Sequence, residues 1–181
     1  MLGDDDTTAR RLRLLKAEFT QHQQRGPDPT GRTATRAEAP APIDLGVLDY
    51  MRAAVTEVEQ HTRAADWSRP AGPVPDDASR VYEWAREHTA HLGKQHQQAR
   101  EALIYRQGLE HAIAAGDTTV IRKHPCPQCG CYGLYWRPET GKAGCVNHYC
   151  TDDDGVSHSW TLAHLAQQHI ASKSALSARA T

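Results

Sequence analysis

The sequence predicts a mainly helical protein: a helical hairpin or small helical bundle, followed by a small C-terminal unit made of a β-hairpin and a helix. Three observations lead to this class. Apolar residues recur at steps of three and four through the middle of the chain, all five cysteines gather between residues 126 and 150, and only 39% of the 181 residues are hydrophobic. Because much of that apolar fraction is Ala, which buries little area, we expect small packed units rather than one large core.

Residues 1–42 are predicted to be a basic N-terminal segment and a flexible linker. Residues 7–42 carry seven Lys or Arg against three acids. Arg10 to Gln24 has the spacing of a short amphipathic helix, and residues 25–42 are rich in Pro, Thr, Ala and Gly, which is typical of a linker. The first residues are acidic where a secretory signal is basic and then apolar, and no stretch approaches the roughly 20 apolar residues of a membrane span. We therefore expect a cytoplasmic protein with no membrane partner.

Residues 43–119 are predicted to form an acidic helical region, with eight Lys or Arg against twelve acids. Its first helix should run from about Asp44 to Ala65, because one face repeats apolar residues at helical spacing. That stripe consists of Leu45, Leu48, Met51, Val55 and Val58. Three prolines in the segment SRPAGPVP, residues 68–75, then end the helix.

A second helical pattern runs from Val81 to Ile113, with Asp76 and Asp77 placed to cap its start and Gly93 placed to kink or divide it. Two or three antiparallel helices follow from these patterns. The stripe is narrow and polar residues interrupt it, so a homodimer that shares the helices is one predicted assembly.

The cysteines are spaced as two pairs of metal ligands. Cys126 and Cys129 have two residues between them, Cys145 and Cys150 have four, and fifteen residues separate the pairs. This spacing is typical of zinc sites, and thiols stay reduced in the cytosol. Strands are expected at 132–136 and 144–149 around a turn at 137–141. We predict one structural Zn²⁺ in a zinc ribbon with a C-terminal helix over residues 120–170; an iron–sulfur cluster is the less favoured alternative.

Other side chains near the cluster leave alternatives open. Cys131 is expected to point away from the ion as a spare thiol, and His148 is an alternative ligand in place of Cys145 or Cys150. Weaker candidates are the ligands His124 and His158, a second metal site at His88, His91 and His96, and a divalent cation at Asp152, Asp153 and Asp154.

The C-terminal helix is predicted to begin at Trp160 with Ser159 as its cap. Its apolar side carries Leu162, Leu165, Ala166 and Ile170, and Trp160 and Leu165 should cover the hairpin. A DNA-reading role for this helix, through His164 and His169, is disfavoured because the helix is poorly basic and follows three aspartates that repel phosphate. Residues 171–181 are expected to fray.

The segments CPQCG, GLYW, CVNHYC and SWTLAHLA together resemble uncharacterised zinc-ribbon proteins of actinobacterial phages and prophages. The resemblance covers about residues 76–170, and its specific part is the ribbon. It implies an accessory phage-type protein acting on host transcription or DNA, with the ligand role on Cys126, Cys129, Cys145 and Cys150. The extra Cys131 and the wide second pair depart from the general ribbon pattern.

No glycine-rich phosphate loop, nucleophile elbow or paired carboxylates accompany the cluster, so we expect a binding module rather than an enzyme. The favoured role is nucleic-acid-associated regulation, in which DNA or RNA contacts exposed aromatic and basic residues of the ribbon. The expected contacts are Tyr135, Trp136, Arg137 and Lys142, with Tyr132 beside them. The alternative is an adaptor whose helices dimerise or dock a host or phage protein while the zinc is purely structural.

Overall fold

The computed structural model describes the backbone of residues 45–179 and the side chains from residue 49 onward. The predicted helix at Arg10–Gln24 and the linker at 25–42 lie outside the described residues. The described chain is mainly helical, with a three-stranded antiparallel sheet near the C-terminal end. The elements in chain order are α2 (Leu45–Ala65), the 3₁₀ turn η1 (Ala78–Arg80), α3 (Val81–Thr89), α4 (Lys94–Ala114), α5 (Thr119–Arg122), β1 (Leu134–Arg137), β2 (Lys142–Cys145), β3 (Ser159–Trp160) and α6 (Leu162–Arg179).

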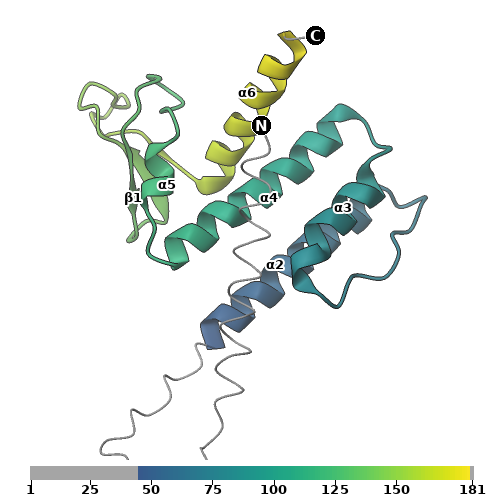
Figure 1. Ribbon diagram of the computed structural model, residues 1–181. Coiled ribbons are helices and arrows are strands. Elements are labelled where there is room, and N and C mark those ends of the chain that lie inside the picture. Colours follow the sequence, from purple (N-terminus) through teal and green to yellow (C-terminus); the bar gives the residue numbers. More distant parts are fainter. Residues whose placement is uncertain (1–44, 180–181) are drawn as a thin grey trace, which may run out of the picture.

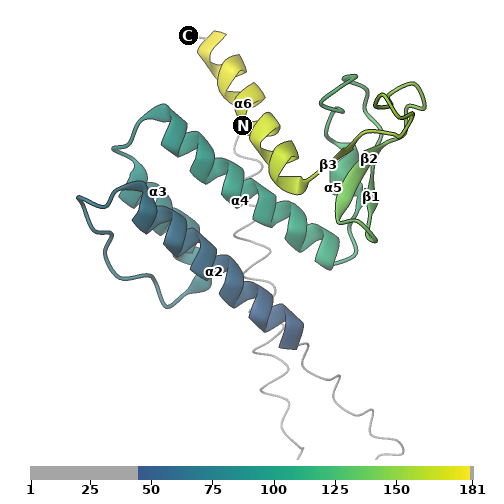
Figure 2. The same cartoon turned by 180° about the vertical axis from the view of Figure 1, so that it is seen from behind.

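Helix α4 lies at the centre of the molecule. Figures 1 and 2 show α2 and α3 on one side of it and α6 on the other, with α5 and the sheet beyond its C-terminal end. The predicted division at Gly93 is confirmed, because α3 ends at Thr89 and α4 begins at Lys94. The predicted cap is present as well, since the Asp77 carboxylate accepts a hydrogen bond from the backbone N–H of Ser79 at 3.1 Å.

A first core fills the space between α2, α3 and the N-terminal half of α4. Its buried residues are Met51, Val58, Val81, Tyr82, Trp84, Ala85 and Ile104. The apolar stripe of α2, as far as its side chains are described, is therefore covered within one chain. A homodimer that shares these helices stays a prediction, and it would need other parts of their surface.

A polar residue lies at the centre of the α2–α4 contact. Gln107 is completely buried; its side-chain oxygen accepts a hydrogen bond from the Tyr82 hydroxyl at 2.9 Å. Its side-chain nitrogen donates to the Ala54 carbonyl at 3.1 Å and to the Glu57 carboxylate at 3.0 Å. Arg106 adds ion pairs to Glu57 and Glu110 at the edge of the same contact. These bonds fix how the two helices lie against each other.

A second core joins the C-terminal half of α4 to α5, the sheet and α6. It contains Leu109, Ala112, Val120, Ile121, Leu134, Ala143, Leu162 and Leu165 together with three cysteines. The strands pair in the order β1-β2-β3, with Leu134 opposite Cys145 and Ala143 opposite Trp160. The sheet and the cysteines beside it thus pack on α4 and do not form a separate unit.

The start of the last helix differs from the expectation. Ser159 and Trp160 form β3 by pairing with Gly144 and Ala143, so Trp160 is a strand residue and Ser159 is not a helix cap. The cap is Thr161, whose hydroxyl accepts a hydrogen bond from the backbone N–H of His164 at 3.2 Å. Helix α6 then continues to Arg179, beyond the apolar pattern that ends at Ile170, and fraying of residues 171–181 stays a prediction.

Within the described residues, no helix combines the length and the apolar character that crossing a membrane requires.

Candidate metal centre

The first cysteine pair lies on a tight loop of six residues. The backbone N–H of Cys126 donates to the carbonyl of Cys131 at 2.9 Å, and the N–H of Gly130 donates to the carbonyl of Cys126 at 2.8 Å. Gly130 has a φ of 71°, a left-handed conformation that costs a glycine little. Pro125 and Tyr132 pair across the base of the loop. The loop therefore directs the sulfurs of Cys126 and Cys129 toward one point.

The second pair comes from the end of β2 and the turn after it. The backbone N–H of Cys145 donates to the His158 carbonyl at 3.0 Å, which ties the strand end to the segment before β3. The N–H of Cys150 donates to the Asn147 carbonyl at 2.9 Å, and the Asn147 side chain accepts from the N–H of Tyr149 at 3.1 Å. This turn brings Cys150 back toward Cys145 across four intervening residues.

The structure brings the four predicted ligands together. The sulfurs of Cys126, Cys129, Cys145 and Cys150 all lie within 4.8 Å of one another. The Cys126–Cys150 and Cys129–Cys145 sulfur pairs are both 3.7 Å apart. A tetrahedral ion with metal–sulfur bonds of about 2.3 Å has ligand sulfurs about 3.8 Å apart, so the arrangement fits four-coordinate binding. Four protein ligands leave no position for a reacting water.

Burial and hydrogen bonding shift the pKa values of the thiols in different directions. Burial raises the pKa of the Cys145 and Cys150 thiols, whereas the backbone N–H of Cys131 lowers the pKa of the exposed Cys129 thiol to about 6. The raised pKa values of Cys145 and Cys150 mean that their thiolates need a nearby positive charge. A divalent ion would supply that charge and would release protons as it binds.

The expectation that Cys131 points away from the cluster is wrong. Its sulfur lies 3.1 Å from the sulfur of Cys129 and 3.6 Å from that of Cys145. The reason is the tight loop, which turns the chain back within six residues and leaves Cys131 at the edge of the ligand group. The cluster therefore contains a fifth thiol next to its most exposed ligand.

The alternative ligands do not join the cluster. Among the described residues, the four cysteines form the one group of three or more His, Cys, Asp or Glu side chains that could hold a metal ion. Neither the histidines at 88, 91 and 96 nor the aspartates at 152–154 form such a group. The His148 ring packs against Tyr149 with centroids 3.8 Å apart, and the His158 ring stacks near Trp160. His124 is buried with its Nδ1 atom 3.1 Å from the Val120 carbonyl oxygen.

Three of the four expected nucleic-acid contacts gather at the free end of the β1–β2 hairpin. The guanidinium of Arg137 donates to the Tyr135 hydroxyl, at 2.8 Å from Nε, and lies 5.0 Å from the centre of the Tyr135 ring. Lys142 is exposed and pairs with Arg137 across the strands. Trp136 is only partly exposed because it packs against the second core.

Sequence reasoning missed Gly144 as a part of this surface. A Cβ atom at Gly144 would lie 2.7 Å from Nε of Arg137 and 3.0 Å from the Tyr135 ring, so the absence of a side chain lets the pair lie over β2. The signal was the glycine within the predicted second strand, which is typical of close approach by another group.

Comparison of the chain with protein-family models, curated proteins and solved structures gives no match, so the resemblance to phage-type zinc ribbons stays a prediction.

Proposed function

We propose that Cys126, Cys129, Cys145 and Cys150 hold one structural Zn²⁺ and that the small sheet is a zinc ribbon. Four thiolates in tetrahedral arrangement favour zinc over cations that prefer oxygen ligands. The need for the ion follows from the composition of the sheet: Leu134 is the one large aliphatic side chain that its strands contribute to the second core, whereas cysteines occupy three buried positions of that core. Zinc binding contributes on the order of 10 kcal/mol or more to the folding of such units.

We further propose that the ribbon is a binding module for a single strand of DNA or RNA. The observation that supports this role best is the Tyr135–Arg137 pair, held over Gly144 with Lys142 beside it. An exposed tyrosine offers a face on which a base stacks, at about 1–3 kcal/mol per base, and the two cations attract the phosphates. A single strand is favoured over a duplex because its bases are free to reach the ring.

The zinc proposal is tested by measuring metal content and ligand type together. Protein purified under reducing conditions should contain one zinc per chain by elemental analysis. Replacing zinc with Co²⁺ should give the absorption of a tetrahedral tetrathiolate site. Metal-free protein whose sheet stays ordered after chelator treatment would overturn the proposal, and absorption typical of an iron–sulfur cluster would assign the site to iron.

The nucleic-acid proposal is tested by fluorescence anisotropy with single- and double-stranded oligonucleotides at two salt concentrations. We expect the single strand to bind more tightly, and its affinity to fall as salt is raised. Tyr135→Ala and the double variant Arg137→Ala/Lys142→Ala should each weaken binding. The matched control is Arg69→Ala, which removes a charge from the exposed loop between α2 and α3. No binding at up to about 10 μM protein in low salt would rule out this role.

A second candidate, self-association as part of an adaptor role, is favoured by a separate observation. Trp67 is 91% exposed in the loop between α2 and α3. Exposed tryptophans are enriched among residues that anchor protein interfaces. Light scattering should then give a dimer for the wild-type protein and a monomer for Trp67→Ala; monomers for both proteins would remove this candidate.

A further inference from the structure

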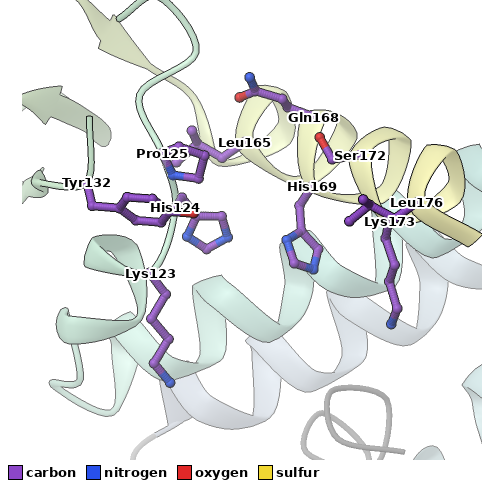
Figure 3. Close-up of a pocket in the computed structure, with 10 residues that line it drawn as sticks. All are labelled: Lys123, His124, Pro125, Tyr132, Leu165, Gln168, His169, Ser172, Lys173 and Leu176. Carbon is purple, nitrogen blue, oxygen red and sulfur yellow. The ribbon is translucent and has the colours of Figure 1, made fainter. Parts of the chain in front are cut away.

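A pocket lies between α6 and the segment that links α5 to the first cysteine loop. Its volume is about 540 Å³, within the usual range for small-molecule sites. Figure 3 shows its walls: Pro125 and Leu165 on one side, Leu176 along α6, and the ring of Tyr132 extending toward His124. Tyr132 is 73% exposed and precedes β1 by two residues, so the pocket adjoins the proposed ribbon.

The formal charges that line this pocket all have one sign. They belong to Lys123 and Lys173, whose side chains both extend downward in Figure 3 at opposite ends of the group, and no Asp or Glu is part of the lining. An apolar hollow with two ammonium groups and an exposed aromatic ring complements a ligand with a flat body and an anionic group.

The imidazole of His124 is held at the bottom of the pocket by contacts at both ring nitrogens. His124 Nδ1 lies 3.1 Å from the Val120 carbonyl oxygen, so it carries a proton that it donates there. His124 Nε2 lies 3.0 Å from the Tyr105 hydroxyl, within hydrogen-bond distance. The Tyr105 ring in turn stacks on His169 with centroids 4.2 Å apart. Packed rings thus form the bottom of the pocket, and the two lysines give its lining formal positive charge.

A further lysine side chain lies beside α6 beyond this pocket. A second hollow of about 570 Å³ shares Lys173 with the first and adds Lys94 from the start of α4. Its one carboxylate, Glu101, is held by Arg86 at 2.8 Å and by Arg100 at 2.8 Å. Because two guanidinium groups neutralise that carboxylate, a polyanion that follows α6 would meet lysines in succession.

We propose that the pocket takes one nucleotide of a bound single strand, with the base against Tyr132 and the flanking phosphates at Lys123 and Lys173. This inference rests on the proposed nucleic-acid role and assigns it a second contact surface, distinct from the Tyr135–Arg137 pair. From this pocket the strand continues along α6 toward Lys94. A strand bound in this way would pass across both the ribbon and the helical part of the molecule.

The test measures the salt dependence of oligothymidylate binding to the zinc-loaded full chain. In Lys123→Ala/Lys173→Ala, the slope of log affinity against log salt should fall in magnitude by about 1.4, since each phosphate contact on a single strand contributes about 0.7. The matched control Arg69→Ala/Arg80→Ala removes two exposed charges from the α2–α3 side and should leave the slope unchanged.

A second measurement examines the pocket without the strand. Thymidine 5′-monophosphate should shift the amide NMR signals of Gln168, His169 and Ser172 in the wild-type protein and not in the double lysine variant. Inorganic phosphate at the same concentration should give smaller shifts, because it has no base to contact Tyr132. Equal shifts with inorganic phosphate would overturn the inference.

The two proposals fail in different ways. If the strand binds, and Tyr135→Ala weakens it, but the lysine variant keeps the full slope and the mononucleotide shifts no pocket signal, the inference is wrong while the proposed function stands. If no oligonucleotide binds at all, the proposed function fails and the inference that depends on it fails too.

Discussion

Cys129 is the one exposed sulfur among the four proposed ligands; Cys126, Cys145 and Cys150 are all buried. It is also the ligand next to Cys131, whose sulfur lies within 3.6 Å of Cys145 as well. Cys126 is on the other side of the group, 3.7 Å from Cys150. The fifth thiol is therefore positioned to replace Cys129 and not Cys126.

This arrangement predicts unequal effects of removing single ligands. Cys129→Ser should still bind one Co²⁺ or Zn²⁺ per chain, with an affinity within about tenfold of the wild type, because Cys131 completes the tetrahedron. Cys126→Ser and Cys129→Ser/Cys131→Ser should both lose far more affinity. Competition between the protein and a chromophoric chelator measures all three. Equal losses in Cys129→Ser and Cys126→Ser would show that Cys131 cannot act as a ligand.

Gln107 provides a second test at the scale of one residue. Gln107→Ala should lower the free energy of unfolding by about 3 kcal/mol, because it leaves the buried Tyr82 hydroxyl without its partner, removes the hydrogen bond to the Glu57 carboxylate and opens a cavity. Urea unfolding followed by circular dichroism measures the change. Gln95→Ala is the control: the residue is exposed on the same helix, so the change should stay within about 0.5 kcal/mol. Similar values for both variants would mean that the buried network contributes little.

Single residues show which parts of the site the sequence could predict. The four ligands were predictable because the spacing within each cysteine pair is a local property of a turn. The direction of Cys131 was not, since it depends on how the loop of residues 126–131 closes against Tyr132. The role of Gly144 depends on side chains from the neighbouring strand, and the burial of Gln107 depends on partners more than 20 residues away. Sequence periodicity contains no information about such partners.

At the scale of elements, the contact between α3 and α4 includes an ion pair that makes stability depend on pH. Burial tends to raise the pKa of the Glu101 carboxyl, but hydrogen bonds and charge from Arg86 and Arg100 outweigh it and lower the pKa below the usual value of 4.5. A carboxyl with a lowered folded pKa stabilises the fold above its unfolded pKa. That contribution is lost as the pH falls from about 4.5 through the folded pKa.

In Glu101→Gln, the free energy of unfolding should therefore fall less as the pH is lowered than it does in the wild-type protein. Between pH 7 and pH 4, the wild-type protein should lose more unfolding free energy than the variant, by at most about 1 kcal/mol, because pH 4 lies only just below the unfolded pKa. Denaturant unfolding at both pH values measures this difference, and subtracting one protein from the other removes the contribution of the cysteines that they share. Glu83→Gln, an exposed carboxylate on α3, is the control and should follow the wild type. An unchanged difference in Glu101→Gln would show that this ion pair does not stabilise the α3–α4 contact.

The elements themselves were predictable where local signals set their limits. The end of α2 at Ala65 and the break at Gly93 follow from the proline-rich segment and from the glycine. The start of α6 was not predictable from local signals, because Ser159 and Trp160 have acceptable helix-start chemistry but pair instead with β2. Helix α5 has only four residues, so it is too short to show a helical pattern of apolar residues in the sequence. Its side chains Val120 and Ile121 are buried by the sheet and by α4 rather than by its own pattern.

At the scale of the whole molecule, α4 belongs to both cores. Ile104 packs with α2 and α3, whereas Leu109 and Ala112 pack with the sheet and α6. The residues between them include Gln107, whose hydrogen bonds hold α4 to α2. The cysteine cluster is part of the second core. If the cysteine loops and the sheet lose their order, the C-terminal half of α4 therefore loses the residues that cover it.

Removing the metal should therefore affect the two ends of α4 differently. If the proposed ion holds the small sheet, its removal leaves the sheet unable to offset its loss of chain entropy, and the Leu109 face of α4 loses its cover. Hydrogen exchange after treatment with a chelator should show lost protection in the sheet, in α6 and around Leu109, while amides near Val58 and Val81 stay protected by the first core. The same protein reloaded with zinc is the control and should recover its protection. Uniform loss along all helices would show that the two cores fold as one unit, and unchanged protection would show that the sheet does not depend on a metal.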